Sequence, residues 1–310
     1  MELIRGLHNL RPEHHGCVAT IGNFDGVHLG HQAVLGQLNE KADALGLPAV
    51  VITFEPQPRE FFALDSAPPR LTRFREKIEA LRRYGVRRVL VLPFNDRLAR
   101  MPAEAFVQRV LVQGLGVKYL VVGDDFRFGR GRAGGFATLQ AAGRAHGFQV
   151  AHMHTFHVDG ERVSSTRIRR VLEQGKMAEA SRLLGRDYRM SGRVAHGEKL
   201  GRQLGFPTAN LFLHRRATPL EGIFVVEIYG LDEEPLQGVA SLGNRPTVNG
   251  TRTLLEVYIF DFDQQIYGRH LQVSFLHKLR DQAKFASLEA LVAQIERDVD
   301  EARAWFTRAA

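Results

Sequence analysis

The sequence predicts an α/β domain with a parallel sheet, followed by a small antiparallel β-barrel that ends in a C-terminal helix. Three observations lead to this fold class. A chain of 310 residues is about twice the common domain size. Its first part alternates short β-branched runs with helical patterns, and its last part repeats short strands separated by turns. We place the division so that residues 1–186 form the first domain and residues 187–310 the second.

The first domain reads as a Rossmann-like alternation of strands and helices. Its expected strands, each apolar and bounded by Gly, Pro or Asn, are Val18–Ile21, Ala49–Phe54, Arg88–Leu92 and Tyr119–Val122. The helical patterns between them are Gln32–Leu45, Phe74–Tyr84, Ala103–Gly114 and Ala137–His146. Such alternation predicts right-handed crossovers and ligands bound beyond the carboxyl ends of the strands.

The second domain follows a helix at Met177–Leu184, which Gly185 can end. Short strands are expected at Met190–Ala195, Gly222–Ile228, Val239–Ser241, Thr253–Ile259 and Leu271–Phe275. Turn dipeptides such as Asn249-Gly250 and Gly268-Arg269 separate them, which favours a small barrel. A helical period of apolar residues from Ser287 to Phe306 predicts the final helix.

Charge is unevenly distributed along the chain. The net charge is +8, with 27 basic and 18 acidic side chains in residues 1–186 (net +9) but 15 and 16 in the rest (net −1). A basic half indicates an anionic partner, which is a nucleic acid, a membrane surface or phosphorylated small molecules. Apolar runs such as Ala49–Phe54 are too short to span a bilayer, and no signal peptide is visible.

The single cysteine, Cys17, excludes an intramolecular disulfide and a cysteine-based zinc knuckle. A reducing compartment fits this composition, so we expect a cytoplasmic protein.

A glycine-rich stretch, Gly22–His31, follows the first strand and leads into a helix. Its glycines let the backbone approach a ligand, and the helix N-terminus offers N–H groups to phosphate. His28 and His31, three residues apart, would point the same way and could stabilise negative charge on a phosphate oxygen. The alternative is a turn that carries two surface histidines.

A second polar motif, Val163–Arg169, places three hydroxyls before a basic residue at a helix start. The hydroxyls of Ser165 and Thr166 can cap the helix or bond phosphate oxygens, and Arg169 can grip phosphate with its two-pronged guanidinium. Taken alone, this motif reads equally well as an ordinary helix cap followed by solvated arginines.

Aromatic and proline residues follow directly after two of the predicted strands in the sequence. The stretch Thr53–Phe62 carries Pro56, Pro58 and Phe62, and the stretch Gly123–Gly129 carries Phe126 and Phe128. Rigid prolines and aromatic faces suit a flat heterocycle. Ordinary core packing is the alternative, and for Phe54 alone it is the better one.

The second domain contains its own polar loop, Gly201–Asn210. Gly201 and Gly205 would allow close phosphate contact, and Thr208 and Asn210 offer hard oxygen ligands for Mg²⁺. Glu256 stands inside the apolar strand Leu254–Phe260, where a carboxylate must face either solvent or a site. On its own, Glu256 reads as a solvent-facing strand residue.

Together these motifs resemble the prokaryotic bifunctional FAD synthetases, in the family's order and over nearly the whole chain. The first domain resembles the nucleotidylyltransferase superfamily, through the His-x-Gly-His pattern of His28–His31 and through Val163–Arg169. The second resembles riboflavin kinases through Gly205–Asn210. The resemblance implies that the second domain phosphorylates riboflavin to FMN with ATP. The first would then join FMN to the AMP part of a second ATP, giving FAD and pyrophosphate.

The resemblance also implies roles for individual residues. In the first domain His28 and His31 would stabilise the α-phosphate transition state. The nucleotide or its metal would lie near Gly22, Asn23, Phe24, Asp25 and Asp125, with Ser165, Thr166 and Arg169 on the triphosphate. In the kinase domain Thr208 and Asn210 match magnesium and phosphate positions, beside Gly201 and Gly205, and Glu256 matches the general base. Flavin contacts would come from Pro56, Pro58, Phe62, Phe126, Phe128 and Arg280.

Three positions depart from the family's pattern. Asp125 occupies a place often held by Asn, Tyr258 stands where His is common, and Gln282 stands where Glu is usual. The segment Leu279–Phe285, which contains Gln282, should help to close the flavin pocket. The expected cofactor is Mg²⁺, and the expected partners are ATP, riboflavin and FMN, with no nucleic acid and no membrane.

Two alternatives remain at this point. One is a chain in which only the adenylyltransferase is active, because Gln282 weakens the kinase pocket. The other is a basic nucleic-acid-binding protein, supported by arginine pairs such as Arg82-Arg83 and Arg87-Arg88. Those pairs lack interleaved aromatic residues, so a solvated surface explains them. The oligomeric state is not predicted.

Overall fold

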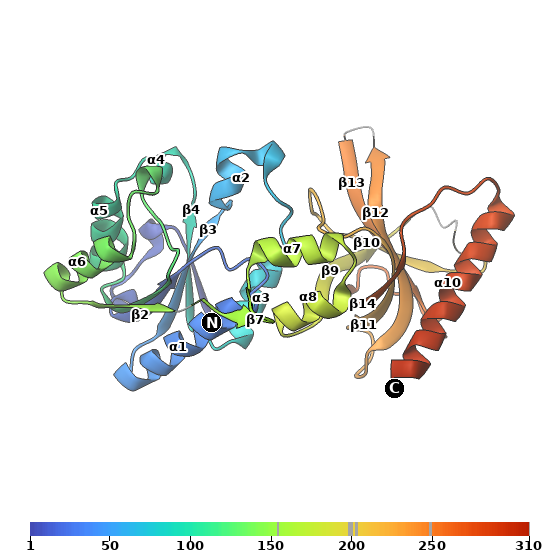
Figure 1. Ribbon diagram of the computed structural model, residues 1–310, viewed down its shortest axis with the longest axis horizontal. Coiled ribbons are helices and arrows are strands. Elements are labelled where there is room, and N and C mark those ends of the chain that lie inside the picture. Colours follow the sequence, from blue (N-terminus) through green and yellow to red (C-terminus); the bar gives the residue numbers. More distant parts are fainter. Residues whose placement is uncertain (154, 198–200, 202–203, 248–249, 310) are drawn as a thin grey trace. The chain divides into compact units, whose positions relative to one another are not determined.

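A computed structural model describes residues 1–153, 155–197, 201, 204–247 and 250–309. The chain forms two compact units, shown in Figure 1. The first unit comprises Met1–Pro68 and Phe74–Ser164, and the second comprises Pro69–Arg73 and Ser165–Ala310. Each unit has its own sheet and its own core.

The first unit is built on a six-stranded parallel sheet with strand order β1-β4-β3-β2-β5-β6. The strands are β1 (Glu2–Arg5), β2 (Cys17–Ile21), β3 (Ala49–Glu55), β4 (Arg88–Pro93), β5 (Val117–Gly123) and β6 (Gln149–Met153). The predicted parallel sheet is therefore confirmed, and the four predicted strands form its centre. The two edge strands, β1 and β6, were not predicted, because their exposed residues interrupt the apolar run.

Helices cover both faces of this sheet. The helices of this unit are α1 (Leu29–Leu45), α2 (Pro58–Phe62), α3 (Phe74–Arg83), α4 (Asp96–Ala99), α5 (Ala103–Phe106) and α6 (Phe136–His146), of which all but α2 contribute to the cores on the two faces. The shorter elements are η1 (Leu7–Asn9), η2 (Pro12–His14), η3 (Leu64–Ser66), η5 (Arg130–Arg132) and the hairpin β7 (His157–Val158) and β8 (Glu161–Arg162). The helix expected at Ala103–Gly114 starts as α5 and continues as a π-helix, η4 (Val107–Gly114). Its wider turn buries Val107, Val110 and Leu111 together.

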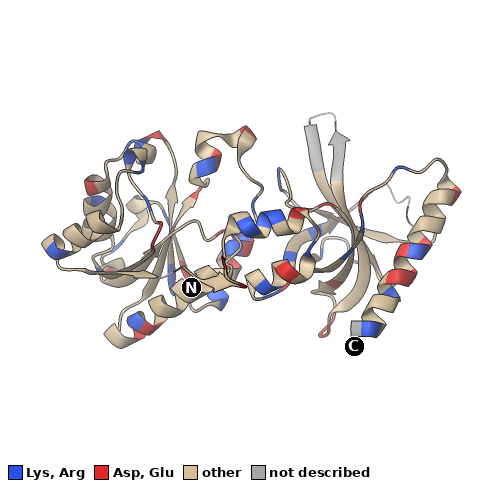
Figure 2. Ribbon diagram, viewed as in Figure 1, with Lys and Arg blue, Asp and Glu red and all other residues tan. Residues whose placement is uncertain are grey.

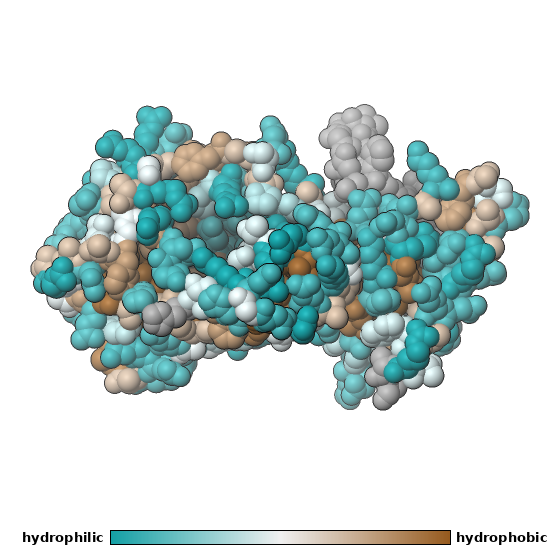
Figure 3. Space-filling model, viewed as in Figure 1, coloured by the Kyte–Doolittle hydropathy of each residue, from teal (hydrophilic) through white to brown (hydrophobic). Residues whose placement is uncertain are grey.

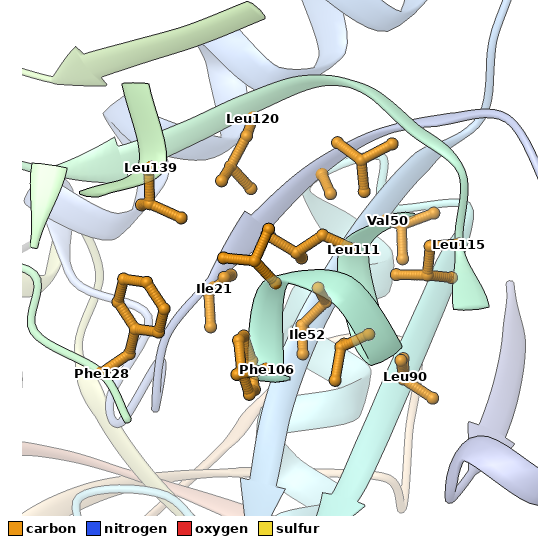
Figure 4. Packing of buried hydrophobic residues seen from close by; sticks show 14 of the residues in the cluster. Ile21, Val50, Ile52, Leu90, Phe106, Leu111, Leu115, Leu120, Phe128 and Leu139 are labelled. Carbon is orange, nitrogen blue, oxygen red and sulfur yellow. The ribbon is translucent and has the colours of Figure 1, made fainter. Parts of the chain in front are cut away.

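The core of the first unit has one apolar layer on each side of the sheet. On one face Ile21, Val50 and Ile52 of the strands pack against residues of α5, η4 and α6, as Figure 4 shows. On the other face Val18 and Val51 pack against Leu35 of α1 and Leu81 of α3. Burial on both faces explains why these strands read as continuous apolar runs.

The strand order places a switch point beside β2. After β2 the chain adds β3 and then β4 on one side, whereas β5 and β6 pair on the other side of β2. At such a point the loops leaving neighbouring strands diverge, which opens a crevice at the carboxyl edge of the sheet. The loop Gly22–His28 leaves β2 at this edge.

The second unit is a closed antiparallel barrel with strand order β10-β13-β12-β11-β14-β9, as predicted. Its strands are β9 (Tyr188–Ala195), β10 (Thr208–Phe212), β11 (Gly222–Tyr229), β12 (Leu236–Thr247), β13 (Gly250–Ile259) and β14 (His270–Arg280). Its helices are α7 (Ser165–Glu173), α8 (Met177–Leu184) and α10 (Leu288–Ala309). The strand β10 lies where a loop leading to Thr208 and Asn210 was expected. Asn249, of the predicted Asn-Gly turn, lies outside the described residues.

The helix α10 packs on the outer face of the barrel wall. Ala302 and Phe306 of α10 join Ile223, Val225 and Val239 of the wall in one buried cluster. The apolar period that predicted this helix is therefore the face that covers the barrel.

A five-residue strap, Pro69–Arg73, belongs to the second unit although its neighbours in sequence belong to the first. Arg73 donates to the carbonyls of Leu213 (2.8 Å) and Ser191, and the Tyr188 hydroxyl donates to the carbonyl of Leu71 (3.0 Å). Arg215 donates to the carbonyl of Arg70 (2.8 Å). No local pattern in the sequence predicts these long-range hydrogen bonds.

No helix among the described residues is long and apolar enough to cross a membrane.

Candidate functional site

The loop that follows β2 has an unusual backbone. Phe24 and Val27 adopt positive φ angles of 48° and 42°, on either side of Gly26 at 87°. Such angles are costly for a β-branched residue such as Val27, and residues held in this region cluster at functional sites. The side chains of Phe24 and Val27 are fully buried in the core, which holds the strained loop in place.

The two histidines of this loop are stacked on each other. Their ring centroids are 3.7 Å apart and their planes differ by 18°. His28 is the N-cap of α1, and its Nδ1 accepts a hydrogen bond from the backbone N–H of His31 at 3.3 Å. When neutral, His28 therefore carries its proton on Nε2. The start of α1 therefore fixes the orientation of both imidazole rings.

Burial, followed by the charges of His28 and Lys77, holds the pKa of His31 well below its usual range. His31 is therefore neutral at neutral pH. Its buried Nδ1 and the buried Oδ1 of Asn23 have no hydrogen-bond partner among the described residues. Buried polar atoms are usually satisfied, so these two mark the loop as a place for a polar ligand.

The carboxylates predicted for this region lie in different surroundings. Asp25 is 3% exposed in the loop after β2. Asp125, after β5, has a side chain that is 64% exposed and pairs with Arg162 of β8 at 2.6 Å. Next to it, a hydrogen bond from Thr155 is the main cause that lowers the pKa of Asp124. An exposed arginine thus holds Asp125 at the carboxyl end of β5.

The prolines and aromatics after β3 form an exposed aromatic cluster. A cis peptide precedes Pro56, and Pro58 begins α2. The backbone N–H of Gln57, the N-cap of this helix, donates to the Glu60 carboxylate at 2.9 Å. Phe62, at the end of α2, is 67% exposed, and apolar surface gathers over α2 in Figure 3. Its ring lies 5.7 Å from that of Phe94, which sequence reasoning missed because Phe94 stands alone after β4.

The second aromatic pair, Phe126 and Phe128, follows β5, and its two members differ in exposure. Phe128 is only 7% exposed and belongs to the core cluster, where it packs against Phe106 at 5.5 Å. Phe126 stacks on Phe128 at 5.6 Å and is partly exposed. Phe128 therefore packs in the core, and Phe126 is the more accessible of the two. The mid-loop position of both residues gave no signal of this difference.

The predicted phosphate residues of Val163–Arg169 lie at the start of α7, in the second unit. Ser165 is the first residue of this helix. Arg169 is 9% exposed and its Nε donates to the carbonyl of Pro69 in the strap at 2.6 Å. One N–H group of the Arg169 guanidinium, which was expected to bind phosphate, thus donates to a backbone carbonyl instead. Figure 2 shows the run of basic residues along α7.

The barrel carries a cavity of about 430 Å³ against its outer wall. It is lined by Gly201, Leu204, Phe206, Thr208, Ile223, Val239, Ser241, Gly243, Leu254, Glu256, Tyr258, Arg280, Gln282, Ala283, Phe285, Leu291, Ile295 and Asp298. This volume and this mostly apolar lining with a few polar groups are typical of a small-molecule site. Sequence reasoning missed the contribution of α10, because periodicity predicts a helix but not what it covers.

Strand pairing explains how the polar groups come together in this cavity. Glu256 of β13 lies opposite Asn210 of β10 on one side and Ser241 of β12 on the other. Thr208 lies opposite Tyr258 in the same way. Because side chains alternate along a strand, these residues share one face, whereas Leu255 and Val257 point into the barrel and are fully buried. Glu256 thus faces the cavity and not open solvent.

The loop before β10 closes on itself. The carbonyl of Gly201 accepts from the N–H groups of Leu204 (3.1 Å) and Phe206 (2.8 Å), and Gly205 uses a φ of 86°. Arg202 and Gln203, part of the same predicted motif, lie outside the described residues. A side chain at Gly201 would meet the carbonyl of Phe206 at 2.4 Å, so the tight loop requires glycine there.

Arg280 is held by a partner that the sequence did not reveal. Its Nε and its terminal nitrogen donate to both carboxylate oxygens of Asp298 on α10, at 2.8 and 2.7 Å. Asp298 is 3% exposed and also accepts from Gln294 at 2.9 Å. The guanidinium edge of Arg280 is therefore occupied, so any flavin contact must use its planar face. On the same side, Gln282 donates to Ser241 at 3.2 Å.

Comparison with known proteins agrees with both halves of this description. The model of the FAD synthetase family matches residues 10–167, and that of the riboflavin kinase family matches residues 184–306. Proteins named bifunctional riboflavin kinase/FMN adenylyltransferase are similar over almost the whole chain. The one from Pseudomonas fluorescens is 54% identical and that from Escherichia coli 51%, covering 98% and 99% of this chain and 97% and 98% of their own lengths.

The relative from Haemophilus influenzae is 50% identical over 99% of both chains. A crystal structure from Streptococcus pneumoniae, described as a macrolide-efflux protein, matches with a TM-score of 0.85 and 31% identity, covering 98% of this chain and 100% of that one. That description belongs to the other protein. The chain itself belongs to the family of bifunctional riboflavin kinase/FMN adenylyltransferases.

Proposed function

We propose that the two activities of this enzyme are divided along the chain, with residues 1–186 as the FMN adenylyltransferase and residues 187–310 as the riboflavin kinase. The kinase phosphorylates riboflavin with ATP, and the adenylyltransferase converts FMN and ATP to FAD and pyrophosphate. The two family matches, at residues 10–167 and 184–306, support this division. The helices α7 and α8 pack within the second structural unit. We assign them by function to the first module.

In the adenylyltransferase, an oxygen of the FMN phosphate attacks the α-phosphorus of ATP, and the bond to the β-phosphate breaks. His28 and the neutral His31 donate hydrogen bonds to the α-phosphate as negative charge grows there. Asn23 supports the nucleotide through its unpaired buried oxygen. Ser165, Thr166 and Arg169 bind the triphosphate, the first two through their hydroxyls and the third through its guanidinium.

The flavin of FMN stacks on Phe62 of the exposed aromatic cluster and on Phe126 of the loop after β5, with Pro56 and Pro58 holding the loop after β3 rigid. Gly22, Phe24 and Asp25 shape the loop around the nucleotide. Phe128 supports Phe126 from the core.

In the kinase, Glu256 accepts the proton of the riboflavin hydroxyl while that oxygen attacks the γ-phosphorus of ATP, and the bond from the γ-phosphorus to the β–γ bridging oxygen breaks, which releases ADP. The cavity beside Glu256 takes the flavin, whose ring packs on Arg280 and apolar residues of α10. Gly201 and Gly205 bring the backbone close to the phosphates.

Mg²⁺ fits the oxygens present on β10. Thr208 and Asn210 lie two residues apart on one face of this strand, and Asn210 uses its amide nitrogen, toward the Thr208 carbonyl at 3.4 Å, which leaves its oxygen for a ligand. Mg²⁺ prefers few protein oxygens together with phosphate and water, so two neutral donors suffice. When bound, the ion would neutralise phosphate charge. Among the described residues no cluster of three His, Cys, Asp or Glu side chains could hold a metal by itself.

The observation that carries the assignment is Glu256, a carboxylate facing a mostly apolar cavity beside Thr208. The test is a two-substrate assay on the full chain, following FMN and FAD by chromatography. Glu256→Gln should lose FMN formation and keep FAD formation from added FMN, and His31→Ala should do the reverse. Glu234→Ala, in the exposed β11–β12 turn, is the control and should keep both activities. Loss of both activities in each variant would contradict independent modules.

The remaining predictions go with this assignment. We propose a cytoplasmic location and no nucleic-acid partner. Retention on heparin that depends on salt, without any change in flavin fluorescence on titration, would favour a nucleic-acid-binding protein instead. An assay that yields FAD from FMN but no FMN from riboflavin would leave only the adenylyltransferase, as the substitution at Gln282 would allow.

A further inference from the structure

The largest fully buried side chain in the described part of the chain is that of a lysine. Lys77, on the first turn of α3, has an exposed fraction of 0%. Burying an ammonium group costs several kcal/mol in hydration free energy. Its position near a helix N-terminus adds repulsion by the helix dipole. Nothing in the proposed mechanism uses this residue so far.

Lys77 lies at the carboxyl edge of the sheet, beside the histidine loop. Its Nζ is 3.5 Å from the hydroxyl of Thr53, which is also fully buried. Thr53 is on β3, next to β2, and the N–H of Gly22 donates to the carbonyl of Ile52 at 3.0 Å. Thr53 therefore lies level with Gly22, where the histidine loop starts.

The helices that carry Lys77 and His31 cover the same face of the sheet. Leu35 and Leu38 of α1 and Ala80 and Leu81 of α3 belong to one buried cluster. Lys77 and His31 both lie in the first turns of their helices, at the edge where the strands end. The fold thus brings a fixed positive charge to the same end of the sheet as the histidine pair.

We propose that Lys77 is a positioning residue for adenylyl transfer, which supplies a fixed positive charge at the edge of the sheet where the His28–His31 pair stands. This inference rests on the proposed function. In the reaction a bond forms between the FMN phosphate oxygen and the α-phosphorus, and the bond to the departing pyrophosphate breaks. Lys77 neither gives nor takes a proton, and it acts through His31 and the local field.

The electrostatics around His31 agree with this role. The groups whose charges act on it are His28, stacked on its ring, and Lys77 from α3, and both lower the pKa of His31 in addition to the larger effect of burial. A histidine kept neutral cannot contribute a full charge to the transition state. The buried ammonium can, and in a site of low dielectric its field is weakly screened.

The experiment compares Lys77→Met with Lys118→Met in the full chain. Methionine has nearly the shape of lysine without its charge, and Lys118 is an exposed lysine on β5 of the same unit. For Lys77→Met we expect kcat for FAD formation to fall at least ~10-fold with little change in KM. The kcat is measured well below the Tm of each variant, because removing one member of a buried polar contact lowers stability. FMN formation and the Lys118→Met variant should remain as in the wild type.

A second readout separates this role from a structural one. The pKa of His31, followed by NMR and assigned with His31→Ala, should rise in Lys77→Met because a repelling charge is gone. A Tm that falls together with kcat, at an unchanged His31 pKa, would mean that Lys77 serves folding only and would overturn the proposal.

Two outcomes distinguish this inference from the proposed function. A wild-type chain that forms no FAD from FMN would refute the proposed function. A wild type that forms FAD, with His31→Ala inactive and Lys77→Met fully active, would refute only the role of Lys77. If Lys77→Met does not fold, Lys77→Arg and Lys77→Gln replace it: the charged variant should be the faster one, and equal rates would overturn the proposal.

Discussion

The ion pair between Arg280 and Asp298, called the clamp below, predicts a measurable loss of stability and of riboflavin binding when it is broken. Asp298 is 3% exposed and accepts from Arg280 at 2.7 and 2.8 Å, and from Gln294 at 2.9 Å. Both Arg280 and Asp298 line the cavity. Removing the carboxylate therefore leaves a guanidinium without its main partner in the cavity wall.

The magnitude follows from burial. Breaking a fully buried ion pair by removing one partner costs about 3–5 kcal/mol. The side chain of Arg280 is 23% exposed, so water can replace part of the lost contact. We therefore expect Asp298→Ala to cost about 2–3 kcal/mol, which is a fall in Tm of roughly 4–12 °C for a unit of this size.

The assay is thermal unfolding of the full chain, together with KM for riboflavin in FMN formation. Because the freed Arg280 disturbs the wall, KM should rise about tenfold, equivalent to ~1.4 kcal/mol. FAD formation from added FMN should not change. Glu296→Ala is the matched control, since Glu296 is exposed on the same helix. If Asp298→Ala and Glu296→Ala have the same Tm and KM, the clamp does not support the cavity and the reasoning is refuted.

Two further predictions concern the first unit. Phe128→Ala should destabilise it by about 3–5 kcal/mol, because it empties a core site. Phe62→Ala should leave Tm unchanged and raise KM for FMN, because Phe62 is 67% exposed; equal effects of the two variants on Tm would contradict their assignment. Burial raises the pKa of the Cys17 thiol to about 12, so the native protein should resist alkylation at pH 8 and react only when unfolded. Because folding raises the pKa of this thiol, the protonated thiol contributes its full share of the unfolding free energy below the unfolded pKa of about 8.5. This contribution is lost between about pH 9 and 12, and pH-dependent unfolding can measure the loss.

How far the sequence predicted the fold depended on whether a segment carries its pattern locally. The strands β2 to β5 were predicted because both of their faces are buried, which makes them continuous apolar runs. The edge strands β1 and β6 have exposed residues and no such run. The strand β10 was missed because Thr208 and Asn210, two of its five residues, are polar and interrupt the apolar run.

The candidate site divides in the same way. The stacked pair His28 and His31 was visible as a spacing, since one turn of helix fixes their geometry. The buried position of Phe128 was not visible, because it depends on Phe106, 22 residues away along the chain. Glu256 was visible as a misfit in an apolar strand, but only strand pairing decides that its face looks into a cavity.

By itself the sequence determined the two fold classes and indicated candidate residues for phosphate chemistry, because periodicity and short motifs are contained within a few neighbouring residues. Only the tertiary structure decided which of these residues are free to act. In the tertiary structure Arg280 is paired with Asp298, and Arg169 donates to the strap. Phe128 is buried, and Lys77 lies at the end of the sheet where the histidine loop starts. Each of these contacts joins positions distant in sequence, and their free energies depend on burial and partners that no local pattern encodes.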